Sequence, residues 1–232
     1  MPGILITGSN RGLGLEWAQQ YSAAGWRVYA TCRQPLQATE LQQLASQNTN
    51  VSVHRLDVTD AAQLEQLATE LRDYSIDLLI NNAGVYFEKF TSDNISHIDY
   101  DQWQETFHVN SLGAVRVSEA FTPHLQRGAT RLVVAITSHM GSIAEIGSAG
   151  SYAYRSSKAA LNAAMKGLSL ELKQYRIGVL LLHPGWVQTR MGGPGALLTT
   201  QDSVADMRRI IEQFDMGMSG QFYRYDGSII PW

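Results

Sequence analysis

Short apolar segments alternate with amphipathic segments along this chain of 232 residues. The apolar segments have the length and composition of strands. They cover Gly3 to Thr7, Trp26 to Thr31, Val51 to Leu56, Ile76 to Asn81, Arg131 to Thr137, Ile177 to Leu182 and Gln221 to Tyr225. The stretches Leu132 to Ile136 and Val179 to Leu182 contain no polar residue. That composition is typical of strands buried on both faces, as in a parallel sheet.

The segments between these strands predict helices, several with capping signals such as Asp60 before the third helix and Gly25 after the first. The predicted helices cover Gly12 to Ala24, Ala38 to Gln47, Asp60 to Asp73, Asp101 to Phe121, Tyr152 to Tyr175 and Asp202 to Phe214. Pro123 is expected near the end of the fourth helix. The mostly polar stretch Tyr86 to Asp99, the sequence H-P-G from His183, and G-G-P-G from Gly192 predict loops.

This alternation predicts an α/β fold, a doubly wound parallel sheet with helices on both faces. No linker and no internal repeat interrupts it, so residues 1–232 are expected to form a single domain. Ligands of such sheets bind beyond the carboxyl ends of the strands. Polar or glycine-containing motifs follow the first six predicted strands, beginning at Gly8, Arg33, Asp57, Asn82, Ser138 and Pro184. That shared placement indicates one binding site better than any single motif does.

The first of these motifs is the loop G-S-N-R-G-L-G, between the first strand and the first helix. Its residues are Gly8, Ser9, Asn10, Arg11, Gly12, Leu13 and Gly14. Glycines permit a tight turn and a close approach of the backbone to a diphosphate, and the helix N-terminus provides N–H donors. The loop therefore predicts a dinucleotide site, and the alternative is a glycine-rich turn without a ligand.

The segment after the second strand favours NADP(H) over NAD(H). An enzyme that prefers NAD usually has an acidic residue there, which binds the ribose 2′-hydroxyl. This chain instead reads V-Y-A-T-C-R-Q, with Arg33 and no acid. Arg33 and Arg11 can hold a 2′-phosphate through charge-assisted hydrogen bonds. The alternative is that both arginines are ordinary surface residues.

The sequence Y-A-Y-R-S-S-K places Tyr154 four residues before Lys158 in a predicted helix. Positions i and i+4 share a helix face, so the ammonium group can lie beside the phenol. A neighbouring cation favours the phenolate and lowers the pKa of the tyrosine. Such a tyrosine can serve as a proton donor or acceptor near neutral pH. Tyr152 lacks this partner, because Ser156 stands four residues after it.

Two further polar residues are candidates for the same site. Ser138 follows an apolar strand and can donate a hydrogen bond to a substrate oxygen, with Ser142 as the second choice. Asn110 can bind a main-chain carbonyl or a water near Lys158, or make a hydrogen bond between helices. His139, beside Ser138, is a weaker candidate. The six histidines have no metal-ligand spacing, and no nucleophile–base triad stands out.

Composition narrows the function further. The net charge of −3 and the absence of a basic run give no electrostatic case for nucleic acid or an anionic membrane. A single cysteine, Cys32, excludes an internal disulfide. No apolar stretch approaches the roughly 20 residues of a membrane span, and the first residues do not resemble a signal peptide. A cytoplasmic location is therefore expected.

Together these motifs resemble the short-chain dehydrogenase/reductase family over essentially the whole chain. The resemblance rests on T-G-x-x-x-G-x-G, N-N-A-G, a serine, Y-x-x-x-K and P-G-x-x-x-T, which begin at Thr7, Asn81, Ser138, Tyr154 and Pro184. Within the family the chain most resembles the C-factor and sniffer group of carbonyl reductases. The segments A-T-C-R, T-R-M-G-G-P-G and D-G-S-I-I-P-W carry that similarity.

The resemblance implies a Rossmann fold and roles for residues at the matching positions. Tyr154 would be the general acid in reduction, Lys158 would lower its pKa and hold the nicotinamide ribose, Ser138 would orient the carbonyl, and Asn110 would anchor a water. Asp57 and Val58 would contact the adenine. The residues implied to line the remainder of the cofactor cleft are Asn82, Ala83, Gly84, Pro184, Gly185, Val187 and Thr189.

These observations predict an NADPH-dependent carbonyl reductase acting on a small-molecule aldehyde, ketone or quinone. The alternative is a C-factor-like dinucleotide-binding signalling protein in which turnover is incidental. Little sequence follows Thr189, so the substrate pocket is expected to be open. Apolar and alanine-rich faces on the helices Asp101 to Phe121 and Tyr152 to Tyr175 predict a homodimer or a homotetramer built from it.

Overall fold

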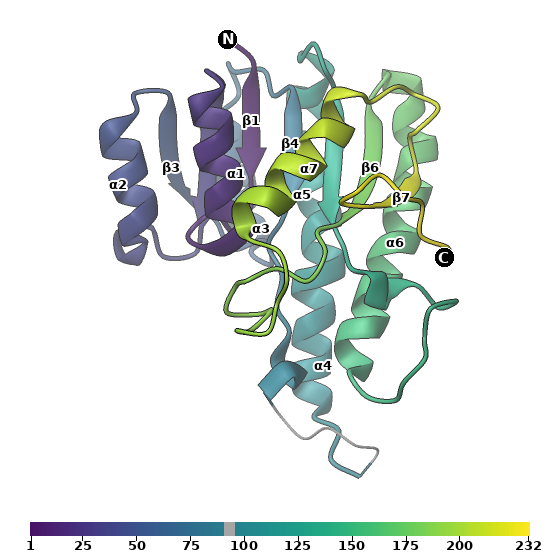
Figure 1. Ribbon diagram of the computed structural model, residues 1–232. Coiled ribbons are helices and arrows are strands. Elements are labelled where there is room, and N and C mark those ends of the chain that lie inside the picture. Colours follow the sequence, from purple (N-terminus) through teal and green to yellow (C-terminus); the bar gives the residue numbers. More distant parts are fainter. Residues whose placement is uncertain (91–95) are drawn as a thin grey trace.

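The computed structural model of the protein, which describes residues 1–90 and 96–232, contains one seven-stranded sheet in the order β3-β2-β1-β4-β5-β6-β7. All neighbouring strands are parallel (Figure 1). The strands are β1 (Gly3–Ile6), β2 (Arg27–Cys32), β3 (Val51–Arg55), β4 (Leu78–Asn81), β5 (Leu132–Ile136), β6 (Gly178–His183) and β7 (Gln221–Arg224). The predicted doubly wound parallel sheet is confirmed.

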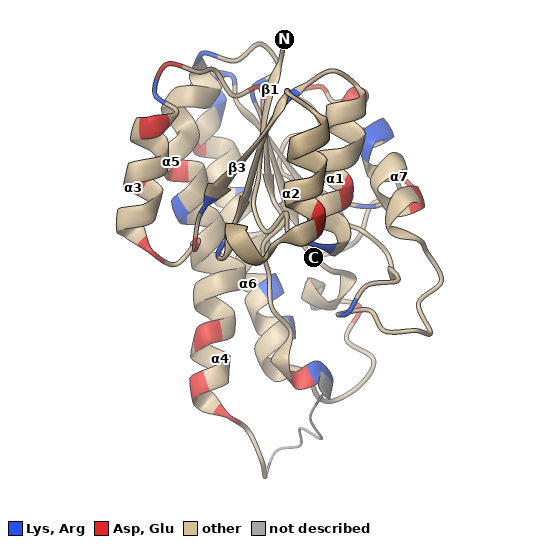
Figure 2. Ribbon diagram, turned by 90° about the vertical axis from the view of Figure 1, so that its left-hand side faces the viewer, with Lys and Arg blue, Asp and Glu red and all other residues tan. Residues whose placement is uncertain are grey.

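Helices cover both faces of the sheet, and each face has its own hydrophobic core. On one face α1 (Gly12–Ala23), α2 (Thr39–Gln47) and α7 (Thr200–Glu212) pack around side chains such as Trp17 and Leu41. On the other face α3 (Ala61–Glu70), α5 (Ala114–Gln126) and α6 (Tyr152–Leu172) pack around Phe121 and Met165. Figure 2 shows the edge of the sheet between these two helical layers.

The predicted helix Asp101 to Phe121 differs from the structure in two ways. In the structure this region consists of α4 (Tyr100–Phe107), a π-helical segment η3 (His108–Gly113) and α5. The chain also stays helical beyond Pro123 to Gln126, because a proline near the C-terminus of a helix removes only one main-chain hydrogen bond. The π-helical segment carries Asn110, whose amide group bonds to main-chain atoms outside the helix. Hydrophobic periodicity cannot reveal a one-residue insertion of this kind.

Smaller elements complete the chain. Short 3₁₀ turns are η1 (Pro35–Gln37), η2 (Phe87–Phe90), η4 (His139–Gly141) and η5 (Lys173–Tyr175). The turn η2 lies in the stretch Tyr86 to Asp99 that was predicted to be loop, and residues 91–95 of that stretch lie outside the described residues. Within the described residues, no helix is both long enough and apolar enough to span a bilayer.

The strand order reverses direction between β1 and β4, where the chain crosses to the other half of the sheet. At such a switch point the loops after the neighbouring strands diverge and leave a crevice at the carboxyl edge. The loop after β1 and the loop after β4 both leave the sheet there. Figure 1 shows that α4 and the first turns of α6 project beyond this same edge. The predicted binding residues are therefore grouped at one end of the molecule.

Candidate active site

The glycine-rich loop after β1 has a backbone that only small residues permit. Gly8 and Gly12 have φ values of +70° and +55°. A Cβ atom on Gly14 would lie 2.1 Å from the main-chain oxygen of Gly8. Arg11, the N-cap of α1, makes no side-chain capping bond, so the first N–H groups of the helix receive no side-chain cap from it. This is the geometry of an anion site at a helix N-terminus.

Two predicted cofactor residues hold this loop in place. Asn82 Nδ2 donates to the main-chain oxygens of Thr7 and Gly8 at 2.9 and 3.2 Å. Ser9 is fully buried, and its hydroxyl donates to the oxygen of Ile6. The side chains of Asn82 and Ser9 therefore fix the main-chain conformation of the loop. The Ala83 N–H donates to the Thr7 hydroxyl, which joins the loops after β1 and β4.

Cationic side chains gather around the open side of the loop. Burial lowers the pKa of Arg11, and the nearby guanidinium groups of Arg190 and Arg33 lower it further. In residues 1–90 and 96–232, none of these arginines forms an ion pair with an acidic group. Asn10 and Leu13 lie in the same loop. Three arginines without an acidic partner leave a site of positive potential for an anion.

A surface groove of about 280 Å³ begins at Arg33 and runs along α4. Its lining residues are Arg33, Asp57, Thr59, Asp101, Gln104, Glu105, His108 and Val109. Arg33 and Asp57, both predicted cofactor residues, meet there. The Asp57 carboxylate accepts two hydrogen bonds from Thr59, and the Val58 side chain is buried beneath Gly113. Two of the residues expected to hold the adenosine end, Arg33 and Asp57, thus line one groove.

The loop after β6 approaches the glycine-rich loop from the opposite side. The methyl group of Thr189 would lie 3.3 Å from a Cβ atom on Gly12. Val187 is buried, and Gly185 has a φ of +83°. The main-chain oxygen of Pro184 accepts a hydrogen bond from Ser203. These contacts place the predicted segment from Pro184 to Thr189 across the crevice from Gly12.

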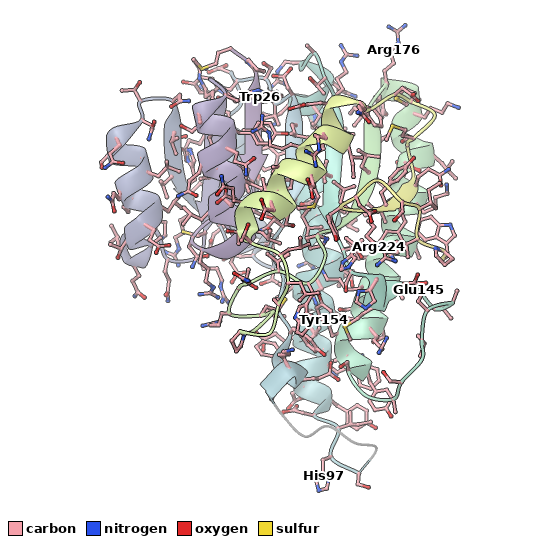
Figure 3. All side chains as sticks on the ribbon, viewed as in Figure 1. Trp26, His97, Glu145, Tyr154, Arg176 and Arg224 are labelled. Atoms are coloured by element: carbon pink, nitrogen blue, oxygen red, sulfur yellow. The ribbon has the colours of Figure 1, made fainter. Side chains whose placement is uncertain are left out.

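Tyr154 and Ser138 meet at the carboxyl edge of the sheet. The Ser138 hydroxyl lies close enough to the Tyr154 hydroxyl to lower the pKa of the phenol, and it accepts from the Met140 N–H at 3.1 Å. Tyr154 is the third residue of α6 and lies below the strands in Figure 3. Lys158 is buried one turn later, with its Nζ atom 5.8 Å from the centre of the Tyr154 ring. The three predicted catalytic side chains therefore form one cluster.

The pKa of Tyr154 is shifted in the direction opposite to the one predicted. Burial raises it to about 12, whereas the hydrogen bond from Ser138 acts to lower it. Lys158 does not reverse this shift, because burial lowers its own pKa to about 8 and its Nζ donates to the main-chain oxygen of Ile136 at 3.0 Å. In this structure Tyr154 therefore holds its proton at neutral pH.

The sequence left two kinds of contact open for Asn110, one to a main-chain group and one between helices, and Asn110 makes both. Its side chain donates to and accepts from the main chain of Val85, at 2.9 and 2.8 Å. It also donates to the Ser157 hydroxyl on α6 at 3.0 Å. A Cβ atom on Gly84 would lie 3.2 Å from Asn110 Oδ1 and 3.6 Å from Lys158 Nζ. Asn110, Gly84 and Lys158 thus meet beside the catalytic cluster.

The family model for short chain dehydrogenases matches residues 3–196 of this chain. The chain belongs to the short-chain dehydrogenase family. C-signal of Myxococcus xanthus is 44% identical over 169 residues, which are 73% of this chain and 100% of that protein. The carbonyl reductase Sniffer of D. melanogaster has a TM-score of 0.93 and 32% identity over 100% of both chains. A carbonyl reductase from chicken fatty liver, solved with NADPH, also has a TM-score of 0.93 and 32% identity, covering 100% of this chain and 99% of that one.

Two histidines of this dehydrogenase lie next to the cluster. His139 Nδ1 and His183 Nε2 are 3.2 Å apart, which joins the turn after β5 to the end of β6. Burial lowers the pKa of His183 to about 3, and it also lowers the pKa of His139. Both rings are therefore neutral at physiological pH. In the part of the chain that the structure describes, no group of three or more His, Cys, Asp or Glu side chains is placed to bind a metal ion.

The sequence did not identify several residues of the site in this dehydrogenase. Arg190 joins Arg11 and Arg33 from a distant loop, and its position after Thr189 was the only signal. Tyr86 is an aromatic residue that the sequence places near the expected pocket, but its stacking on the Tyr154 ring, with centroids 4.1 Å apart, was not predicted. The Glu88 carboxylate accepts from the N–H groups at the start of α6. These last contacts join residues more than 60 positions apart, which local sequence patterns cannot show.

Proposed function

We propose that the protein is an NADPH-dependent carbonyl reductase that converts an aldehyde, ketone or quinone to the alcohol. As a member of the short-chain dehydrogenase family, it is an oxidoreductase. The observation that carries the finer proposal is the cluster of Tyr154, Ser138 and Lys158 beside the glycine-rich loop. A pure binding protein has no need of a buried, protonated tyrosine beside a serine at the end of a cofactor crevice.

The cofactor is NADP(H), and the residues present fit this molecule. A Cβ atom at positions 8, 12 or 14 would meet backbone or side-chain atoms of neighbouring loops, so glycines allow the tight turn that a diphosphate site uses. Arg11, Arg33 and Arg190 provide the positive charge that a 2′-phosphate requires, and no acid follows β2. The chicken carbonyl reductase, similar over 100% of this chain, was solved with NADPH bound.

NADPH supplies a hydride for the carbonyl carbon when it is bound. The chain's own residues act on the carbonyl oxygen. Tyr154 retains its proton at neutral pH and can donate it to that oxygen as negative charge develops. Ser138 can donate a second hydrogen bond to the same oxygen and stabilise the charge. Lys158, held by the Ile136 carbonyl and close to Gly84, places a positive charge beside the phenol and the cofactor crevice.

The surface around this cluster favours a moderately apolar substrate. Trp186 and Leu197 are exposed on the loop after β6, and Ile143 and Ile146 are exposed on the segment after η4. The Trp186 indole is fixed by a 2.8 Å hydrogen bond to the oxygen of Gly192. Exposed apolar side chains near a catalytic crevice are typical of a site that binds apolar compounds.

A second candidate function is a dinucleotide-binding signalling protein in which turnover is incidental. The 44% identity to C-signal supports it. Both functions require the glycine-rich loop and the arginines, but only the reductase requires Tyr154 and Ser138.

The test is the rate of NADPH oxidation with a panel of aldehydes, ketones and quinones. NADH in place of NADPH is the cofactor control, and Tyr154→Phe is the matched control for the chemistry. A reductase consumes NADPH with at least one class of carbonyl compound, and Tyr154→Phe abolishes that consumption. If NADPH binds tightly in a fluorescence titration but no carbonyl compound is reduced, the reductase is excluded and the signalling function is favoured.

We also propose that the protein assembles as a homodimer or homotetramer through α4, α5 and α6, and that it is cytoplasmic. On the helices predicted to form the interface, Val117 and Met165 are buried against the sheet, whereas Leu112 and Ala163 are exposed. An exposed leucine and an exposed alanine on neighbouring elements leave a smooth surface for a second copy. Light scattering at micromolar concentration tests the assembly, and a monomeric mass would contradict it.

A further inference from the structure

The N-terminus of α6 is not capped by its own N-cap residue. Ser151 occupies the N-cap position with a φ of +55°, and its side chain makes no capping bond. Its hydroxyl is instead 2.5 Å from the Tyr86 hydroxyl. A serine at this position usually accepts from an N–H group of the first turn. The first N–H groups of the helix that carries Tyr154 therefore need another acceptor.

Glu88 provides that acceptor from a distant part of the chain. Its Oε1 atom accepts from the Ala153 N–H at 2.9 Å, and its Oε2 atom accepts from the Tyr154 N–H at 2.7 Å. A carboxylate at a helix N-terminus is favourable, because it meets unsatisfied donors and the positive end of the helix dipole. One of the two bonds is made to the main chain of Tyr154 itself.

Tyr86 fixes the ring of the same residue. Its ring stacks on the Tyr154 ring with centroids 4.1 Å apart and planes 20° apart. The bond from Tyr86 to Ser151 anchors the stacking ring to the start of α6. On the other side, Asn110 binds both main-chain groups of Val85, which holds the segment before Tyr86. Residues 85–88, called the capping segment below, thus contact Tyr154 through backbone and ring.

We infer that Glu88 and Tyr86 are positioning residues, which hold the Tyr154 hydroxyl against Ser138 by fixing the backbone and the ring of the tyrosine. This inference rests on the proposed role of Tyr154 as the proton donor. It adds Glu88 and Tyr86 as residues that orient the hydroxyl group, and neither belongs to a family motif of the sequence. The capping segment acts from outside the Ser138–Tyr154–Lys158 cluster.

The negative charge of Glu88 has a second effect. A carboxylate close to a phenol opposes its ionisation, so Glu88→Gln is expected to lower the pKa of Tyr154. The titratable and charged groups closest in the chain to these contacts include Tyr152, Arg155 and Lys158 on α6, Tyr86, Glu88 and Lys89 at η2, and His139 on η4. Glu88→Gln removes one charge from this set and leaves the others. A change in the pH profile of this variant therefore reports the charge at the cap.

The experiment compares Glu88→Gln, Tyr86→Leu and Tyr86→Phe with Glu65→Gln, an exposed control on α3. Steady-state rates are measured with NADPH and the best carbonyl substrate. Glu88→Gln is expected to lower kcat about tenfold, the scale of one hydrogen bond to a charged group, with the KM for NADPH unchanged. Tyr86→Leu lowers kcat similarly, and Tyr86→Phe recovers most of it, because phenylalanine retains the stacked ring.

The pH profile of the reverse reaction, alcohol oxidation, separates positioning from general damage. Its rise is expected to move to lower pH by about half a unit in Glu88→Gln and to stay in place in Glu65→Gln. If kcat and the pH profile of Glu88→Gln match those of Glu65→Gln, the inference is wrong. Failure of Glu88→Gln to fold would leave the Tyr86 pair as the test, and equal kcat in Tyr86→Leu and Tyr86→Phe would then overturn the role of the ring.

These outcomes are distinct from failure of the proposed function. If Tyr154→Phe retains turnover, Tyr154 is not the acid and the proposed function itself fails. If Tyr154→Phe is inactive while Glu88→Gln and Tyr86→Leu behave like the control, the proposed function stands and only the positioning role is excluded.

Discussion

The two ends of the crevice are built in different ways. The core of the cofactor end is the glycine-rich turn between β1 and α1, a single run of residues that Arg33, Asn82 and Arg190 join from other loops. The catalytic end combines α6, the π-helical segment η3, the turn after β5 and residues 85–88. Two of its contacts, Val85 with Asn110 and Glu88 with Tyr154, join residues that are 25 and 66 positions apart.

The main-chain conformation thus determines the shape of the cofactor end, whereas side-chain packing determines the arrangement of the catalytic end. At the cofactor end, glycines fix the shape of the loop, and main-chain N–H groups and arginines are available to bind an anion. At the catalytic end, a buried phenol and a buried ammonium group depend on neighbours from several elements for position and protonation. Substitutions should therefore affect binding at one end and kcat at the other.

Tyr154→Phe is the sharpest test of the catalytic end and has the largest expected effect. The variant loses the proton donor but retains the ring that stacks on Tyr86. We expect kcat to fall at least about 100-fold, the usual scale of general acid catalysis, while NADPH affinity and the fold are retained. Steady-state rates, NADPH titration and circular dichroism measure the three quantities. Near-normal turnover by the purified variant would contradict the assignment of Tyr154 as the acid.

The same difference explains how much could be predicted from the sequence. The sheet, the glycine-rich loop and the placement of Tyr154 and Lys158 on one helix follow from local patterns, and the structure places them as expected. The direction of the Tyr154 pKa shift was predicted incorrectly, because helical spacing reveals the neighbouring ammonium group but not the burial of both side chains. The carboxylate cap from Glu88 was missed because nothing near Tyr154 in sequence indicates it.

Gly14→Ala tests whether the backbone builds the cofactor end. A Cβ atom at this position would lie 2.1 Å from the oxygen of Gly8 and 2.7 Å from Asn82 Nδ2, so the loop must shift. We expect a loss of about 1–3 kcal/mol in the free energy of unfolding and at least tenfold weaker NADPH binding.

Gly167→Ala is the matched control for this substitution, because a Cβ atom on Gly167 of α6 would meet nothing within 4 Å. It should leave NADPH affinity unchanged and raise the free energy of unfolding by up to about 1 kcal/mol. Thermal unfolding and NADPH titration of both variants measure the two effects. Equal NADPH affinity in the two variants would show that the close approach of Gly14 to Gly8 does not shape the site.

Arg33→Ala tests the charge at the cofactor end. We expect NADPH binding to weaken by about 1.5–3 kcal/mol, the scale of a hydrogen bond to a charged group, and NADH binding to change little. Arg72→Ala, with a side chain that is 70% exposed just after α3, is the control. Fluorescence titration with both cofactors provides the affinities. Tighter binding of NADH than of NADPH to the unmodified protein would show that the absent acid after β2 does not determine cofactor choice.

The pH dependence of the free energy of unfolding tests the buried charge of Lys158 at the catalytic end. Its expected effect is the smallest. Burial lowers its pKa from 10.5 to about 8 in the folded protein. Between these pH values the unfolded chain binds more protons than the folded chain, so the contribution of Lys158 to stability rises with pH. The rise is at most about 1.4 kcal/mol per pH unit. Below pH 8 both states are protonated, and the contribution is constant.

Comparison with Lys158→Met isolates this contribution from those of other groups. Tyr154, whose raised pKa acts in the opposite direction above pH 10, is present in both proteins and restricts the useful window to pH 8–10. Urea unfolding in that window should show the unmodified protein gaining stability relative to Lys158→Met as the pH rises. Parallel curves would mean that the Lys158 ammonium group is better solvated than its burial in this structure indicates. The catalytic end would then resemble the cofactor end, where charged groups remain close to water.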